Sequence, residues 1–85
     1  MVYVYVNESS ADCDPEIIVY KELDDAKRRI RSMLEEFTET ENYKIDREEK
    51  ARAKQEFHDN DGMDFTVKIS DEEVLRFYVE EKEIY

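Results

Sequence analysis

This sequence contains very little glycine, proline or cysteine. Its 85 residues include one of each and no tryptophan. A single cysteine, Cys13, rules out an internal disulfide framework, and no cysteine–histidine spacing in the chain could build a zinc site. One glycine is too few for a glycine-rich phosphate-binding loop. We therefore expect a fold that depends on its hydrophobic core, with no cofactor and no metal ion.

The chain also lacks the long hydrophobic runs of membrane proteins. No apolar segment approaches the roughly 20 residues of a membrane-spanning helix, and the amino terminus has no basic region followed by a cleavage pattern. We expect a cytoplasmic protein without membrane contact. A chain of 85 residues has room for a single domain, residues 1–85, with one modest core.

Negative charge is what the sequence has in excess. It holds 24 Asp and Glu against 13 Lys and Arg, a formal net charge of -11. Residues 1–22 carry -4, residues 23–55 are balanced, and residues 56–85 carry -7. Phosphates would repel such a chain, so we expect no direct binding of nucleic acid. With 40% hydrophobic residues, six tyrosines and four phenylalanines, the chain is still expected to fold.

Both ends of the sequence have the composition of β-strands. Residues 2–6 alternate valine and tyrosine, and residues 16–20 are again β-branched and aromatic. Apolar and polar residues alternate over 63–69 and 75–79. The only glycine, Gly62, marks a turn before the third of these segments. Four strands are therefore predicted, two at each end of the chain.

The middle of the sequence has a helical period. Apolar residues recur every three or four positions from Leu23 to Phe37, with Asp24 as the expected N-cap. A thinner apolar stripe predicts a short second helix over about 46–57. The sum is an α+β fold: a four-stranded, mostly antiparallel sheet (β-β-α-α-β-β) with the main helix packed on one face.

The alternation of valine and tyrosine in the first strand bears on function. If Val4 and Val6 face the helix, then Tyr3, Tyr5 and Tyr78 point to the opposite face of the sheet. Tyrosine joins a rigid apolar ring to a polar tip and is enriched at protein interfaces. We expect these tyrosines either to pack under the second helix or line a solvated sheet face, or to bind a partner, including a second copy of the chain in a homodimer.

Two patterns that could carry chemistry have simpler explanations. The acidic segment around Gly62 is similar to a calcium loop, but that alignment places Phe57 at the first ligand position and Lys68 where a bidentate glutamate is required. His58 and Cys13 lack a third group to orient them as a catalytic pair. We therefore expect no enzymatic activity.

The acidic surface has two interpretations. It either keeps the protein soluble or imitates nucleic-acid phosphates and occupies a basic groove on a partner. A compact chain of this length has a diameter of about 30 Å, along which B-DNA presents roughly 18 charges. The two ends of the sequence offer 15 carboxylates and 4 bases. That density suits a patch if the two ends lie side by side.

Three stretches carry a resemblance. Val2-Tyr-Val-Tyr-Val6, then Ile17-Ile-Val-Tyr-Lys-Glu-Leu-Asp-Asp-Ala-Lys27, and the closing Arg76-Phe-Tyr-Val-Glu-Glu-Lys-Glu-Ile-Tyr85 resemble small phage and prophage proteins of Gram-positive bacteria. In size and charge the chain is similar to phage inhibitors of host defence, notably anti-CRISPR proteins and other DNA mimics. The resemblance implies a non-catalytic inhibitor, in the cytoplasm of an infected or lysogenic host, that blocks the nucleic-acid-binding groove of a basic protein such as a nuclease.

In this interpretation carboxylates meet the lysines and arginines that normally hold phosphate, and tyrosines supply desolvated contact area. The residues expected to contact the partner are Asp59, Asp61, Asp64, Glu72, Glu73, Glu80, Glu81, Glu83, Tyr78, Tyr3 and Tyr5. Two alternatives stay open. The chain could be an acidic immunity or antitoxin-like protein that neutralises a basic toxin, or a structural module that dimerises through the tyrosine face.

Overall fold

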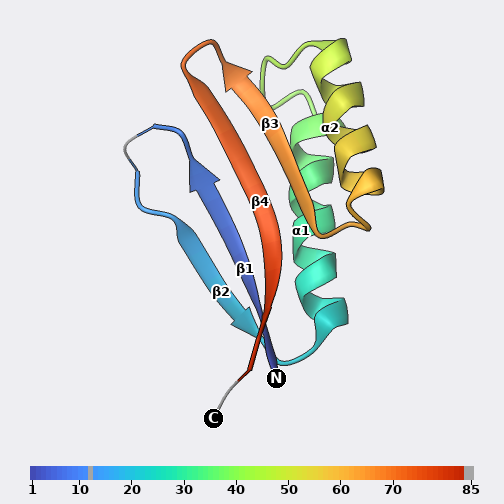
Figure 1. Ribbon diagram of the computed structural model, residues 1–85. Helices are drawn as coiled ribbons and strands as arrows, with labels where there is room; N and C mark the ends of the chain where they lie inside the picture. Colours follow the sequence, from blue (N-terminus) through green and yellow to red (C-terminus); the bar gives the residue numbers. More distant parts are fainter. Residues whose placement is uncertain (12, 84–85) are drawn as a thin grey trace.

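The computed structural model describes residues 1–11 and 13–83. These form six elements: β1 (Val2–Ser9), β2 (Glu16–Tyr20), α1 (Leu23–Thr38), α2 (Arg47–Asp59), β3 (Asp64–Ser70) and β4 (Glu73–Lys82). The four strands make one sheet of order β2-β1-β4-β3, in which every neighbouring pair is antiparallel. Both helices lie against the same face of the sheet (Figure 1), and the described part of the chain leaves its other face uncovered. The predicted α+β class and element order are confirmed.

The first and last strands form the centre of the sheet. β1 pairs with β4 along its whole length, from Val2 opposite Lys82 to Ser9 opposite Leu75. The two acidic ends of the sequence therefore lie side by side, whereas the balanced middle forms α1, the connection and most of α2.

The core lies between α1 and the sheet. The apolar stripe of α1 is buried at Ala26, Ile30, Leu34 and Phe37 and packs on buried strand residues, among them Phe65, Val67, Phe77 and Val79. Complete burial of a side chain of this size contributes about 1.5–3 kcal/mol. The N-cap of α1 is Glu22, not Asp24 as expected; Asp24 lies in the first turn. There its carboxylate still faces the positive end of the helix dipole.

The side-chain direction of β1 differs from the prediction by one residue. Tyr5 is 0% exposed and belongs to the core, and Tyr3 packs against it. The register pairs Tyr5 with Val79 and Ile18, which places these three on the helix-covered face. Of the three tyrosines expected on the other face, only Tyr78 lies there. The predicted tyrosine face was wrong in this respect, because both alternate sets of residues in β1 are apolar and their period does not say which set is buried. The homodimer stays a prediction, to which the buried Tyr5 would contribute no area.

The turn between α2 and β3 forms where the sequence predicts it. Asp61 and Gly62 have φ values of 56° and 75°, in the left-handed region that glycine adopts without strain. The Gly62 N–H donates to the carbonyl of Phe57 at 2.8 Å and so ends the helix. A Cβ on Gly62 would come within 3.2 Å of the Phe57 ring, so this position favours glycine on both counts.

Candidate protein-binding surface

Part of the predicted contact set gathers on one half of the sheet. The N–H of Val79 donates to the carbonyl of Met63 at 2.9 Å. The turn between α2 and β3 therefore lies beside the last residues of β4. We define the acidic end as the carboxylates at the last residue of α2, in that turn, and at or just after the end of β4: Asp59, Asp61, Glu80, Glu81 and Glu83. Asp59 accepts a hydrogen bond from Gln55, and Glu80 pairs with Lys82 at 3.3 Å.

Two of the predicted carboxylates lie apart from the acidic end, and a third, Asp64, lies next to it but is neutralised by an ion pair. Glu72 and Glu73 stand at the β3–β4 hairpin, and seven strand residues place Glu73 roughly 23 Å from Glu80. The Glu73 carboxylate accepts a hydrogen bond from Ser9 Oγ. Asp64 forms an ion pair with Arg76, whose Nη2 lies 2.7 Å from Asp64 Oδ2. The predicted residues therefore do not form one continuous patch.

On the uncovered face of the sheet, β3 and β4 carry a chain of paired polar groups. The guanidinium of Arg76, which holds Asp64, also lies 4.3 Å from the centroid of the Tyr78 ring. Tyr78 Oη donates to Glu8 Oε1 at 2.8 Å, and this hydrogen bond raises the pKa of the Tyr78 phenol. Tyr78 is thus held in one position, as a residue that contributes contact area should be.

The β1–β2 half of the same face is apolar, and sequence reasoning missed it. Val4 and Val6 point to this face together with Ile17 and Val19, which we call the apolar half. Ile17 is 59% exposed and Val19 60% exposed. The available signal was β2 itself: three consecutive apolar residues within five make both faces of a strand apolar, and the predicted helix could cover only one.

The outer edge of β3 is bound by side chains from α2 and the residue after it. We call them the edge brace: Glu49, Arg52, Glu56 and Asn60. The Thr66 N–H donates to Glu56 Oε1 at 2.5 Å, and Arg52 Nη2 donates to the Thr66 carbonyl at 2.9 Å. The Lys68 N–H donates to Glu49 Oε2 at 2.7 Å, and Asn60 Nδ2 donates to the Asp64 carbonyl at 3.1 Å. The hydrogen bond from Arg52 holds the pKa of Glu49 below its usual value.

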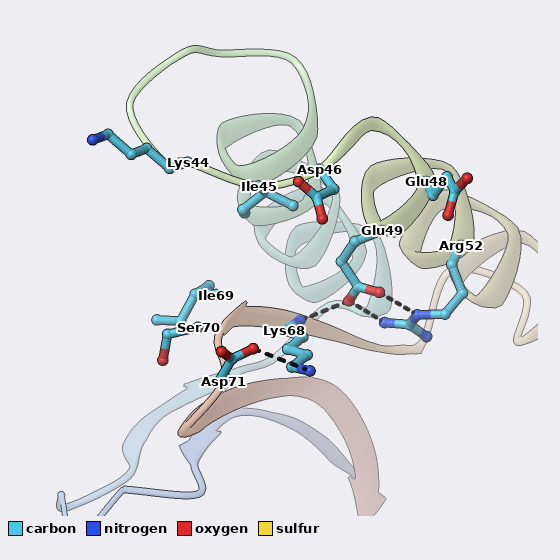
Figure 2. A pocket seen from close by; sticks show the side chains of 10 residues that line it. All are labelled: Lys44, Ile45, Asp46, Glu48, Glu49, Arg52, Lys68, Ile69, Ser70 and Asp71. Carbon is cyan, nitrogen blue, oxygen red and sulfur yellow. Dashed lines mark hydrogen bonds and ion pairs between the residues drawn. The ribbon is translucent and has the colours of Figure 1, made fainter.

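A surface groove of about 770 Å³ lies between the start of α2 and the end of β3. Figure 2 shows Glu49 pointing across it to Arg52 and to the backbone of Lys68. Lys68 Nζ in turn lies 3.7 Å from Asp71. The charged side chains at the centre of the groove are thus already paired with one another. The groove is therefore the polar contact between α2 and β3.

Metal-binding and membrane-spanning features are also missing from residues 1–11 and 13–83. Within them no group of three or more His, Cys, Asp or Glu side chains could hold a metal ion. No helix there is long and apolar enough to cross a membrane. Cys13 is exposed in the β1–β2 loop, and His58 is exposed in the last turn of α2.

The fold and these surfaces define an acidic α+β protein with one uncovered sheet face. No protein-family model, curated protein or solved structure matches the chain.

Proposed function

We propose that this chain is a non-catalytic binding protein that occupies a basic, nucleic-acid-binding surface of a partner protein, as an inhibitor of the kind phages encode. The observation that carries the proposal is the division of charge between the two layers. The segments with charges of -4 and -7 supply the four strands, the turn before β3 and the end of α2 with Glu56 and Asp59, and the balanced residues 23–55 supply α1 and the rest of α2. The excess negative charge therefore belongs to the sheet side of the molecule.

This division suits docking by the sheet side. Carboxylates of the acidic end steer the approach to a basic surface and set its orientation, because rim charges act mainly on the association rate. Tyr78 and the exposed residues of the apolar half, Ile17 and Val19, supply the area that loses water on contact. Glu72 and Glu73, at the far end of β4, reach a second group of partner bases rather than the same one.

The proposal is tested with purified nucleic-acid-binding enzymes, including RNA-guided nucleases. Binding and inhibition of cleavage are measured from low to high salt, with and without DNA. We expect affinity to fall as salt rises and DNA to compete, because both screen or occupy the same basic groups. Affinity that responds to neither salt nor DNA would contradict the proposal. Salt-sensitive binding without competition by DNA would instead favour a toxin-neutralising protein that binds elsewhere.

Matched charge reversals locate the surface. The sheet-side variant combines Asp61→Lys, Glu80→Lys and Glu81→Lys, and the control combines Glu35→Lys, Glu41→Lys and Glu48→Lys in the balanced segment. Both change the net charge equally. We expect the first to weaken binding about 10- to 100-fold and the control about threefold or less, since rim charges contribute up to ~1 kcal/mol each. Equal losses would show that only total charge matters.

A further inference from the structure

The two outer edges of the sheet differ in a way that concerns binding. Every outward backbone group of Thr66, in the middle of β3, is bound by the edge brace, as are the Lys68 N–H and the Asp64 carbonyl. The backbone groups that a partner strand would need at the β3 edge are therefore already hydrogen-bonded. At the other side β2 is the outermost element of the sheet (Figure 1).

The register shows which groups of β2 face outward. In an antiparallel sheet, successive residues direct their N–H and C=O groups to alternate sides. The Ser10 N–H donates to the carbonyl of Val74 at 2.9 Å, so even-numbered residues of β1 face β4 and odd-numbered residues face β2. Tyr5 pairs with Ile18, and the backbone groups of Ile18 therefore point inward. Those of the residues on either side of Ile18 point outward.

These two residues, Ile17 and Val19, expose both backbone and side chain. Among residues 1–11 and 13–83, nothing is hydrogen-bonded to their outward N–H and C=O groups. Their side chains, 59% and 60% exposed, stand on the uncovered face next to Val4 and Val6. An unpaired edge beside an apolar strip is the arrangement by which a sheet accepts an additional strand.

We propose that the β2 edge binds an extended segment of the partner protein as a fifth, antiparallel strand, with apolar residues at alternate positions and lysine or arginine at both ends. This inference rests on the proposed function, a protein partner with a basic surface, and adds the mode of contact. The chemistry of the ends follows from charge, because the exposed carboxylates at the ends of the edge (Asp14, Glu16 and Glu22) outnumber Lys21, the exposed base there.

Charge also argues against a second copy of this chain at the same edge. A symmetric pairing that joins Ile17 of one copy to Val19 of the other brings Asp14 close to Glu22 of the other copy, at both ends of the added pair. Like charges facing each other across strands are destabilising, and each copy carries -11. A strand with basic ends meets the same carboxylates favourably.

In the test, the full chain is mixed with a short synthetic peptide of sequence KKVTITVKK. Hydrogen exchange of the backbone amides of the chain is then measured by NMR with and without the peptide. We expect the amides of Ile17 and Val19 to exchange about tenfold more slowly when the peptide is present at ten times its dissociation constant. The amides of Thr66 and Lys68 are already bound by the edge brace and should not change. Protection at other amides only, or none up to about 5 mM peptide, overturns the proposal.

Matched variants separate the backbone from the side chain. Val19→Pro removes one outward N–H and leaves the β1 ladder intact, because proline is tolerated where a strand N–H faces solvent. Val19→Thr keeps the N–H and the branched shape. We expect the proline variant to lose protection at Ile17 and the threonine variant to retain it. If Val19→Pro does not fold, Ile17→Lys keeps the N–H at an exposed position and should weaken binding of the basic peptide about threefold or more.

Two further outcomes decide the occupant. The peptide EEVTITVEE should give no protection. If it protects Ile17 and Val19 as well as KKVTITVKK does, the inference that the bound strand has basic ends is wrong. Light scattering should show a monomer, and a dimer that protects Ile17 and Val19 would assign the edge to a second copy. Failure here is distinct from failure of the proposed function. If the reversals at Asp61, Glu80 and Glu81 abolish partner binding and Val19→Pro does not, the acidic surface binds the partner without the β2 edge.

Discussion

The ring and the hydroxyl of Tyr5 have opposite effects on the stability of the fold. Its ring is fully buried beneath α1, where the Arg29 guanidinium lies 5.6 Å from the ring centroid. Neither Tyr5 Oη nor Arg29 Nε makes a hydrogen bond of good geometry in the described part of the chain. Burial, with a smaller effect of the Glu16 charge, raises the pKa of the Tyr5 phenol from 10.0 to about 12, although the nearby Arg29 guanidinium partly offsets the rise. The ring therefore stabilises the fold, and the hydroxyl adds a desolvation cost.

Tyr5→Phe is expected to leave stability unchanged or raise it by up to about 1 kcal/mol, whereas Tyr5→Ala should cost about 3–5 kcal/mol. The wild type binds the Tyr5 proton more tightly when folded, so its stability should fall as pH rises from 10.0 to about 12. The phenylalanine variant should lack that part of the decline. Urea unfolding across this pH range measures both effects, and identical pH profiles for wild type and Tyr5→Phe would contradict the buried phenol.

Tyr5 also shows what could and could not be predicted from the sequence for a single residue. Composition was enough to predict β1 as a strand, because valine and tyrosine both favour that conformation. It was not enough to choose the buried face, since Tyr3 and Tyr5 are as apolar along their rings as Val4 and Val6. In β3 and β4, where polar residues alternate with Phe65, Val67, Phe77 and Val79, the buried set was predicted correctly.

Among the elements, α2 is held mainly by polar contacts. Ala53 is its only buried residue, in contrast to five in α1. The thin apolar stripe made this helix hard to place from sequence. What fixes it is the edge brace, whose acceptors and donors recur along one side of the helix and bind the backbone of β3. Sequence reasoning could not foresee these bonds, because Glu49 and Glu56 are only two among 24 acidic residues.

Glu56 carries the clearest test of the edge brace, since it accepts hydrogen bonds from both the N–H and the hydroxyl of Thr66. Glu56→Ala leaves the Thr66 N–H without its acceptor and should cost about 1–3 kcal/mol. Glu56→Gln retains an acceptor oxygen and should cost less. Glu48→Ala, on an exposed position of the same helix, is the control and should change stability by about 0.5 kcal/mol or less. Thermal unfolding ranks the three, and equal losses would exclude the edge brace as a source of stability.

An open β3 edge also has a consequence for association. Unpaired edges template contacts between chains, so Glu56→Ala should aggregate faster than Glu56→Gln when each is kept equally far below its own melting temperature. Light scattering during incubation below the unfolding temperature measures this difference.

For the whole molecule, the order of strands turns a pattern along the chain into a pattern in space. The sequence shows two acidic ends and a balanced middle, but only the pairing of β1 with β4 makes the ends one layer. Alternation and composition predict which segments are strands, but they do not predict which strands are neighbours. The split of Glu72 and Glu73 from the acidic end did not depend on strand order, because the length of the last strand alone separates Glu73 from Glu80 by roughly 23 Å.

Concentrated charge on one layer should make stability depend on salt. The molecule measures 43 × 27 × 20 Å. The screening length is about 30 Å at 0.01 M salt and about 8 Å at 0.15 M, so repulsion reaches across the sheet only at low salt. We expect the melting temperature to rise with sodium chloride over this range. Glu81→Lys, on the sheet side, should raise it at low salt by about 2–4 °C more than Glu41→Lys in the balanced segment, and the difference should vanish near 0.5 M. Equal effects of the two reversals would mean that the net charge acts as a whole, without the layer asymmetry on which binding by the sheet side depends.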